Sequence, residues 1–328
     1  MAEIDRAHAP ERHVELARPA PAVDTRPAAT ADARADAWAD TRTAVATEHA
    51  KAVERMPTGR VDQPDLPVDQ RAEFTYGRPL DATTGRPPPL FDGPPSRDQA
   101  RQGELGDCGV IATMGSVAAH RPQDLTGAVT ENADGSYGVR LHEARWSGPD
   151  RTEPTGQRMD LTVTPEFPVR STAPDQSVYA DQSHSGVAWP GVLEKGIAGA
   201  DGSTSAGATG YERLDGGTDP WERAELLTQL TGEPAVVRPF DKTPGHEAVA
   251  EAEMKDALDA GKPVIVGVPE PPAGVRLPHN LIGGHAYEVV AVDRGTVELH
   301  NPYGFDHPSP MPVRDLLDVS RDHYTTLE

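Results

Sequence analysis

The one cysteine of the chain, Cys108, ends a glycine-containing segment at 102–108 and stands directly before an apolar run. A cysteine in the first turn of a helix lies near backbone N–H groups and the positive end of the helix dipole, which favour the reactive thiolate. We therefore expect a lowered pKa for this thiol. A single cysteine excludes an internal disulfide and a thiolate-rich zinc site, so Cys108 is either an inert packed side chain or a nucleophile.

Two further side chains have the types that a cysteine nucleophile needs. His285 follows two glycines and begins a strand-like run, and Asn301 comes sixteen residues later, at the end of the next Val-rich run. If the two runs pair, the imidazole can act as a general base and the asparagine carbonyl can hold its tautomer. Taken singly, each has a plainer interpretation: a surface or core histidine, and an Asn-Pro turn.

Gln102 is a candidate for the remaining part of such a site. It lies six residues before Cys108, so its side-chain amide could fold back and donate beside the backbone N–H of the cysteine. A donor pair of this kind forms an oxyanion hole, which stabilises the charge that develops on a carbonyl oxygen under attack. The alternative is an ordinary loop glutamine.

The elements that must position these residues follow from hydrophobic periodicity. The pattern predicts a helix that starts at Cys108 and stops before Pro122, and further helices over 190–198, 221–230 and 247–258. Val-rich or alternating runs predict strands over 263–268, 286–292 and 296–300, with shorter ones over 137–142 and 159–163. Helices precede most of the strands, which predicts an α+β fold with helices and sheet in separate layers.

A chain of 328 residues exceeds the usual size of one compact core, so we expect several parts. Residues 1–56 form an N-terminal extension, disordered at first and then Ala-rich and helical; residues 57–97 form a Pro/Gly-rich linker and strap leading into the core. Residues 98–205 form a helical lobe that carries the nucleophile, and residues 206–328 a β-rich lobe that carries the histidine and the asparagine. The exposed character of the strap predicts self-cleavage there.

The charge balance limits the classes of partner. The net charge of −21 would repel phosphate backbones, so we expect no nucleic-acid partner. No apolar run is long enough for a membrane span and the N-terminus lacks the apolar core of a secretory signal, so we expect a soluble protein, cytoplasmic or exported by a non-classical route. The Ala, Arg and Pro bias ahead of a compact unit is typical of some secreted bacterial effectors or toxins, an analogy of architecture only.

Three segments resemble, in order, the active-site blocks of the calpain family: 102–108 (Gln-Gly-Glu-Leu-Gly-Asp-Cys), 284–287 (Gly-His-Ala-Tyr) and 301–304 (Asn-Pro-Tyr-Gly). Segments 189–195 and 210–217 resemble its connecting blocks, so the similarity covers about residues 90–305. It implies a papain-like fold, with the active-site cleft between a helical lobe and an antiparallel β-sheet lobe. It also implies hydrolysis of protein substrates through a thioester, with Cys108 as nucleophile, His285 as base, Asn301 as its orienting partner and Gln102 at the oxyanion hole.

The sequence departs from the family pattern at two of these blocks. Gly109 stands where an aromatic residue usually follows the nucleophile, and Tyr303 stands where the family has tryptophan. We expect the first change to loosen the position of the thiol and slow turnover. The second is milder, because tyrosine still shields the hydrogen bond between Asn301 and His285 from water.

The chemistry itself requires no cofactor, but the resemblance implies calcium in each lobe. The candidate ligands of the first lobe are Gly93, Asp98 and Glu194, of which Gly93 and Asp98 lie one residue out of step with the family pattern. In the second lobe only Asp306 stands close to Asn301. We therefore expect calcium dependence to be partial or absent.

Two other functions fit parts of this pattern. A catalytically weak papain-like module that binds protein segments in its cleft would explain Gly109. Acyl transfer of the transglutaminase kind would use a Cys-His pair, but usually with an aspartate as the orienting partner, and it would release ammonia from a glutamine substrate. The expected partners are a protein or peptide substrate and, for an effector, a cognate inhibitor; the oligomeric state is left open.

Overall fold

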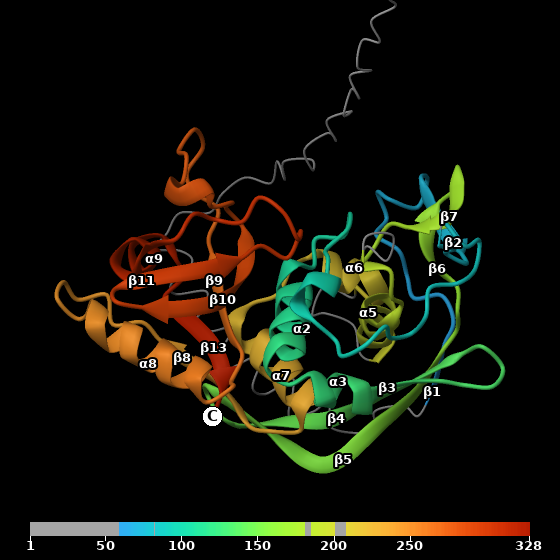
Figure 1. The fold of residues 1–328 in the computed structure, drawn as a ribbon, viewed down its shortest axis with the longest axis horizontal. Coiled ribbons are helices and arrows are strands. Elements are labelled where there is room, and N and C mark those ends of the chain that lie inside the picture. Colours follow the sequence, from blue (N-terminus) through green and yellow to red (C-terminus); the bar gives the residue numbers. More distant parts are fainter. Residues whose placement is uncertain (1–58, 82, 181–184, 201–207) are drawn as a thin grey trace, which may run out of the picture.

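The computed structural model describes residues 59–81, 83–180, 185–200 and 208–328. The predicted N-terminal extension, residues 1–56 with its Ala-rich helix, lies outside the described residues. Figure 1 shows two lobes side by side, with β9–β11, α8 and α9 on the left and α2, α5 and α6 on the right. Among the described residues, no helix combines the length and the apolar character that crossing a membrane requires.

The helix that carries the cysteine, α2 (Cys108–His120), has the predicted bounds, because Pro122 ends it and starts the short α3 (Pro122–Ala128). The other predicted helices are also present, each one to three residues longer: α5 (Trp189–Ala200), α7 (Pro220–Thr231) and α8 (Glu247–Asp259). Five short helical elements were not predicted: α3, α6 (Gly210–Asp215), α9 (Val313–Val319), and the 3-10 turns η1 (Arg97–Gln99) and η2 (Pro278–Asn280).

The main sheet has ten strands, and nine of them form one path in which every pairing is antiparallel. In spatial order these are β12 (Met311–Pro312), β11 (Thr296–His300), β10 (His285–Asp293), β9 (Val264–Val268), β13 (His323–Leu327), β8 (Ala235–Pro239), β5 (Arg151–Val163), β4 (Tyr137–Gly148) and β3 (Val129–Glu131). The tenth strand, β1 (Gly59–Val61), pairs with β5 in parallel. A separate three-stranded sheet contains β2 (Phe74–Gly77), β6 (Phe167–Arg170) and β7 (Ala173–Ser177).

Helices and antiparallel strands confirm the α+β class, but the sheet is not confined to the second lobe. It continues from β13 through β8 into the long β4–β5 hairpin, which lies beneath the helices of the first lobe (Figure 1). The pairing of β5 with β8 joins the two halves of the sheet. It contains two residue pairs, Arg151 with Val236 and Thr152 with Ala235.

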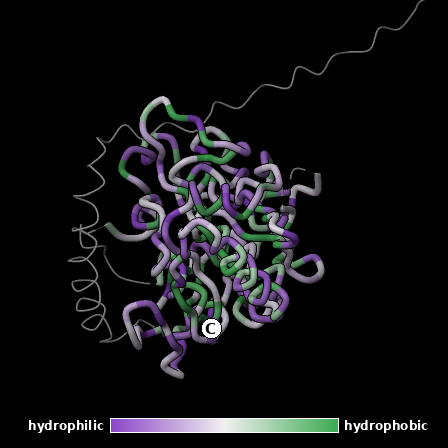
Figure 2. The backbone as a smooth tube through the Cα atoms, turned by 90° about the vertical axis from the view of Figure 1, so that its left-hand side faces the viewer, coloured by the Kyte–Doolittle hydropathy of each residue, from purple (hydrophilic) through white to green (hydrophobic). Residues whose placement is uncertain are grey.

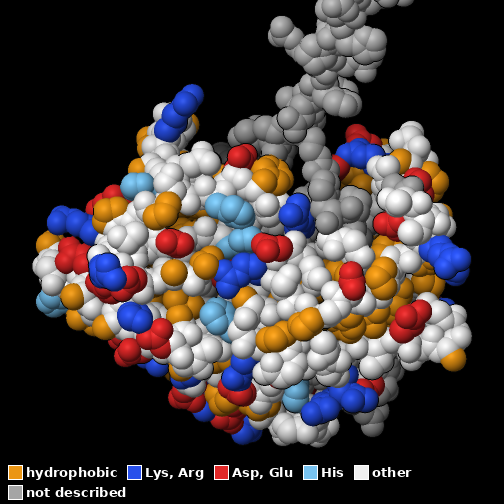
Figure 3. Space-filling model, viewed as in Figure 1, with side chains coloured by type: hydrophobic (Ala, Val, Ile, Leu, Met, Phe, Trp, Pro, Cys, Tyr) orange, Lys and Arg blue, Asp and Glu red, His pale blue; other side chains and the backbone are white. Residues whose placement is uncertain are grey.

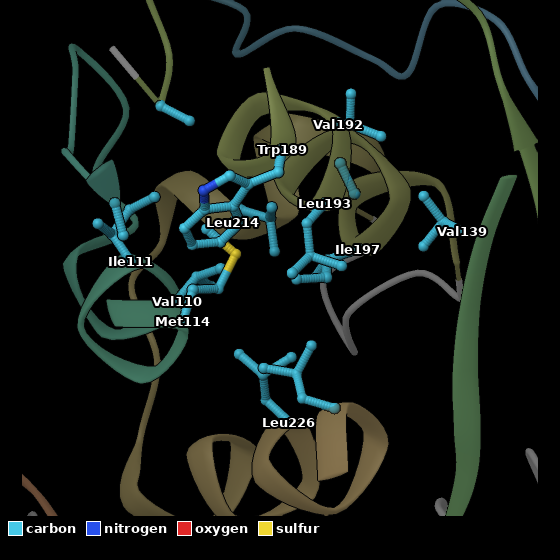
Figure 4. Close-up of a cluster of buried hydrophobic side chains, with 14 of the residues drawn as sticks. Val110, Ile111, Met114, Val139, Trp189, Val192, Leu193, Ile197, Leu214 and Leu226 are labelled. Carbon is cyan, nitrogen blue, oxygen red and sulfur yellow. The ribbon is translucent and has the colours of Figure 1, made fainter. Parts of the chain in front are cut away.

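Two hydrophobic cores lie within the molecule, and apolar segments of the tube in Figure 2 run through its interior. In the first core, Val110 and Met114 of α2 face Trp189 and Leu193 of α5 (Figure 4). Leu226 of α7 packs in the same core, while the second core starts at Phe240. The lobe boundary predicted at residue 206 is therefore wrong, because the apolar face of α7 is buried in the first core.

The segment 57–97 is not an exposed linker from residue 59 onward. Leu66, Phe74 and Leu90 are buried in the first core, and the backbone N–H of Trp189 donates to the carbonyl of Leu90 at 3.1 Å. Its prolines and glycines keep β1 and β2 short, as predicted, while its apolar side chains pack. Residues 83–87 and 92–94 of this segment are exposed, so self-cleavage there stays a prediction.

Candidate active site

Cys108 is the first residue of α2 and is 8% exposed. The backbone N–H groups of Ala286 and Gly109 point their partial charge at the thiol and favour the thiolate, but burial has the larger effect and raises the pKa of Cys108. The lowered pKa that we expected is therefore wrong for this arrangement, because the loss of water around the sulfur outweighs the helix N-terminus. Burial thus favours the neutral thiol over the thiolate.

His285 is the first residue of β10, paired with Val268 of β9 in the ladder. Gly284, immediately before it, has a φ of +66°, a conformation that glycine adopts without strain and that turns the chain into the strand. The imidazole is 5% exposed, and burial lowers its pKa to about 4, although the bond to Asn301 acts in the opposite direction. The imidazole is thus neutral at pH 7.

Asn301 directly follows β11 and lies beside the histidine, as the predicted strand pairing requires. Its Oδ1 lies 3.0 Å from His285 Nε2 and also accepts from the backbone N–H of Tyr303 at 3.1 Å. Its Nδ2 donates to the carbonyl of Asp306 at 3.2 Å, which fixes the orientation of the amide. With Nε2 donating to Asn301, the lone pair of the imidazole is on Nδ1, where a base nitrogen is needed.

Aromatic rings enclose the pair of His285 and Asn301. Tyr303 stacks on the imidazole with centroids 5.0 Å apart and an interplanar angle of 26°, and Tyr287 meets it edge-on at 4.9 Å. Phe305 continues the stack on Tyr303 at 5.9 Å and is 50% exposed. Tyr303 thus covers one face of the imidazole that bonds to Asn301, which agrees with the shielding that we expected of a tyrosine here.

Gln102 lies beside the asparagine block, since its backbone N–H donates to the carbonyl of Pro302 at 2.8 Å. Its side-chain Nε2 donates to the carbonyl of Leu105 at 2.6 Å, within its own loop. The buried amide therefore shapes the turn before the nucleophile. Its role in an oxyanion hole stays a prediction.

A cleft of about 420 Å³ contains both Cys108 and His285 in its lining. Figure 3 shows basic, acidic and histidine side chains mixed along the middle of the face where the two lobes meet. Three arginines also line the cleft, Arg213, Arg223 and Arg321. Sequence reasoning missed them, because no motif or spacing relates α7 to the turn before β13.

Gly109 does not leave the loose space beside the thiol that we expected. A Cβ at this position would overlap Thr218 Oγ1 and would lie 3.2 Å from Thr218 Cβ and 3.3 Å from Arg223 Cδ. Side chains of the segment 218–223 thus occupy the volume that the missing aromatic ring would fill. The prediction of a loosely held thiol is wrong for this reason.

The three candidate calcium ligands are not brought together. Glu194 is 1% exposed and hydrogen-bonds to the buried carboxyl of Asp107, while Gly93 and Asp98 are exposed. Burial raises the pKa of Asp107 to about 7 and that of Glu194 well above its ordinary value, and the nearness of the two carboxyls acts in the same direction on Glu194. Among the described residues, no three His, Cys, Asp or Glu side chains are grouped to hold a metal.

Arg97 of η1 pairs with the buried Glu288 of β10, the strand that begins at His285. Glu288, three residues after His285, is 1% exposed at its side chain and lies 3.1 Å from Arg97 Nη2. Burial raises the pKa of Glu288 to about 7 despite this arginine. The pair fixes β10 against the segment that leads to α2, and so helps to hold the two sides of the cleft in register.

The sequence is similar to that of a known protein family. Residues 62–307 match the family described as calpain family cysteine protease. Calpain clp-4 of Caenorhabditis elegans is 26% identical over 234 residues, which cover 66% of this chain and 29% of that protein. Calpain-9 of Homo sapiens is 25% identical over 261 residues, 74% of this chain and 32% of that protein. The chain thus spans about a third of the length of these relatives. The match and the arrangement of Cys108, His285 and Asn301 agree, and the chain belongs to the calpain family of cysteine proteases.

Proposed function

We propose that the chain is a cysteine endopeptidase that hydrolyses protein segments through Cys108, His285 and Asn301. One observation carries this proposal: the thiol and an imidazole held by an asparagine line the same cleft, with the imidazole nitrogen that does not contact Asn301 available as a base. Family membership and the order of the three blocks support it.

The reaction starts from a neutral pair, because burial favours the uncharged forms of both groups. As the substrate carbonyl enters, His285 takes the proton of Cys108 and the sulfur attacks the carbonyl carbon, which forms a tetrahedral oxyanion. Collapse forms a thioester, and the protonated imidazole gives its proton to the leaving amine. Water then attacks the thioester with the same base and frees the thiol.

Each residue near this centre has a separate role in the proposal. Asn301 keeps the imidazole in one tautomer and orientation, and Tyr303 shields their hydrogen bond. The backbone N–H of Cys108 at the start of α2, with Gln102, would stabilise the oxyanion. We propose that no metal takes part, because the acid residues nearest the nucleophile pair with each other.

The first test is cleavage of unfolded casein by the wild type and by Cys108→Ala and His285→Ala, each with millimolar calcium and with chelator. His246→Ala is the matched control, since His246 is exposed and pairs with Asp241 away from the cleft. We expect cleavage by the wild type and by His246→Ala, and a loss of at least about a thousandfold in the other two variants. Chelator should leave the wild-type rate unchanged.

The outcomes separate the candidate functions. Equal cleavage by the wild type and Cys108→Ala would refute the assignment of the nucleophile. A folded wild type that cleaves nothing but retains an unfolded protein would favour the binding module over the enzyme. Ammonia release without new chain ends would indicate acyl transfer.

A role as an exported effector is a separate proposal. Its support is the Ala- and Pro-rich composition of residues 1–56. Detection of the protein in the medium of intact producing cells would support it, and strict retention in the cells would refute it.

A further inference from the structure

The cleft beside Cys108 contains a buried guanidinium group, two of whose nitrogens have no hydrogen-bond partner among the described residues. Arg223 of α7 is 1% exposed, and its Nη1 donates to the carbonyl of Thr218 at 2.8 Å. Its Nε and Nη2 are buried and have no hydrogen-bond partner among the described residues. Removing a charge from water without a partner is costly, so such a group is normally paired with an anion.

A second arginine lies next to the first. Arg321, in the turn before β13, donates its backbone N–H to the carbonyl of Gly267 at 2.8 Å. A Cβ at Gly267 would lie 3.4 Å from Arg223 Nη2 and 3.3 Å from Arg321 Cδ, so the two side chains converge on this glycine of β9. Like charges at this spacing repel each other, and an anion between them would remove that repulsion.

The carboxylates in the same cleft are already in use. Asp219 and Glu222 form the cap of α7, where Asp219 Oδ1 accepts from the N–H of Glu222 and Glu222 Oε2 from the N–H of Asp219, both at 2.8 Å. Neither supplies a hydrogen bond to the free nitrogens of Arg223. This part of an acidic protein is therefore cationic.

We propose that Arg223 and Arg321 select a substrate with an aspartate or glutamate within about two residues of the scissile bond, since the cleft that they line is continuous with Cys108 and His285. The inference rests on the proposed peptidase function and deepens it. Guanidinium groups match the planar carboxylate, and a desolvated site makes each such bond stronger than in water. The acidic side chain of the bound substrate is the missing anion.

The test starts with a library of peptides digested by the wild type, followed by two synthetic substrates that differ only in Asp against Asn, or Glu against Gln, at the enriched position. We expect kcat/KM to be at least about tenfold higher for the acidic peptide, the effect of one hydrogen bond to a charged group. Arg321→Gln should reduce this ratio severalfold, mainly through KM. Arg321→Glu should reverse the preference toward Lys or Arg.

Arg294→Gln is the matched control, because this arginine is 90% exposed and lies outside the cleft; its acid-to-amide ratio should equal that of the wild type. Arg321 is only partly buried, so its variants keep the fold even if Arg223→Gln does not, and circular dichroism checks this. Cleavage without an acidic preference, or a preference unchanged in both Arg321 variants, would overturn the inference while the peptidase stands. Absence of all cleavage by the folded wild type would overturn the proposed function itself, and the inference with it.

Discussion

Replacing Gly109 with alanine should destabilise the protein, although alanine is the better helix former. The new methyl group would overlap Thr218 Oγ1 and approach Arg223 Cδ to 3.3 Å. Threonine is branched at Cβ and has few rotamers, and Arg223 is buried on all sides, so neither neighbour can move freely. Overpacking of this kind costs about 1–3 kcal/mol.

The same helix contains a matched control in Gly115. A Cβ there would meet its nearest neighbour, Ala100 Cβ, at 3.6 Å, which is an ordinary van der Waals contact. Gly115→Ala should therefore stabilise the protein by about 0.5–1 kcal/mol through helix propensity alone. Both substitutions gain the same helix propensity, so the two variants should differ in their free energy of unfolding by the overpacking cost of about 1–3 kcal/mol.

Urea unfolding followed by circular dichroism measures this difference, provided that the slope with denaturant is equal in all variants. Adding Thr218→Ala to Gly109→Ala should restore part of the loss, because it removes the overlapping Oγ1, which has no hydrogen-bond partner to lose among the described residues. Equal stability of the two glycine variants would refute the reasoning. It would mean that the space beside the thiol is empty, as the sequence alone predicted.

Three further outcomes are expected. Tyr303→Trp should keep kcat/KM within about threefold of the wild type, while Tyr303→Ala should lower it roughly tenfold, because it exposes the imidazole that the ring covers. Equal kcat/KM for Tyr303→Ala and the wild type would contradict the shielding role. The stability that Glu288 contributes is present below its ordinary pKa of 4.5 and is lost as the pH rises through about 7. Glu288→Gln should therefore become more stable relative to the wild type between about pH 5 and pH 8, by a few kcal/mol. If the urea midpoints of the two proteins change in parallel across this range, Glu288 does not titrate there. Calcium in place of chelator should move the thermal midpoint by less than about 1 °C, since Asp98 and Glu194 are not grouped; a rise of several degrees would reveal specific binding.

The positions of the three residues proposed as a triad could be predicted because each follows from a local pattern. The apolar run after Cys108 sets the start of α2, and the two Val-rich runs with a short turn between them bring Asn301 beside His285. Bounds of the predicted helices differ from the structure by no more than two residues, because prolines and turn residues mark their ends.

The rest depends on contacts between distant parts of the chain. Arg223 and Arg321 are almost a hundred residues apart and meet only because α7 and β13 both pack beside Gly267. The pairing of Asp107 with Glu194 likewise needs α2 and α5 in contact. The hydrophobic periodicity of a segment does not indicate which distant segment it contacts. From the sequence alone, a charged residue is expected to face solvent.

The two-pair junction of β5 with β8 also governs how a substrate can enter. Because one hydrogen-bonded ladder runs through both lobes, the lobes cannot swing apart without breaking main-chain bonds, and α7 packs on both sides of the junction. The width of the cleft is thus set by the backbone and not by side-chain contacts that open easily. In the proposed peptidase, a polypeptide would have to arrive already extended, as a loop or an unfolded segment, so the folded state of a target would decide whether it is cut.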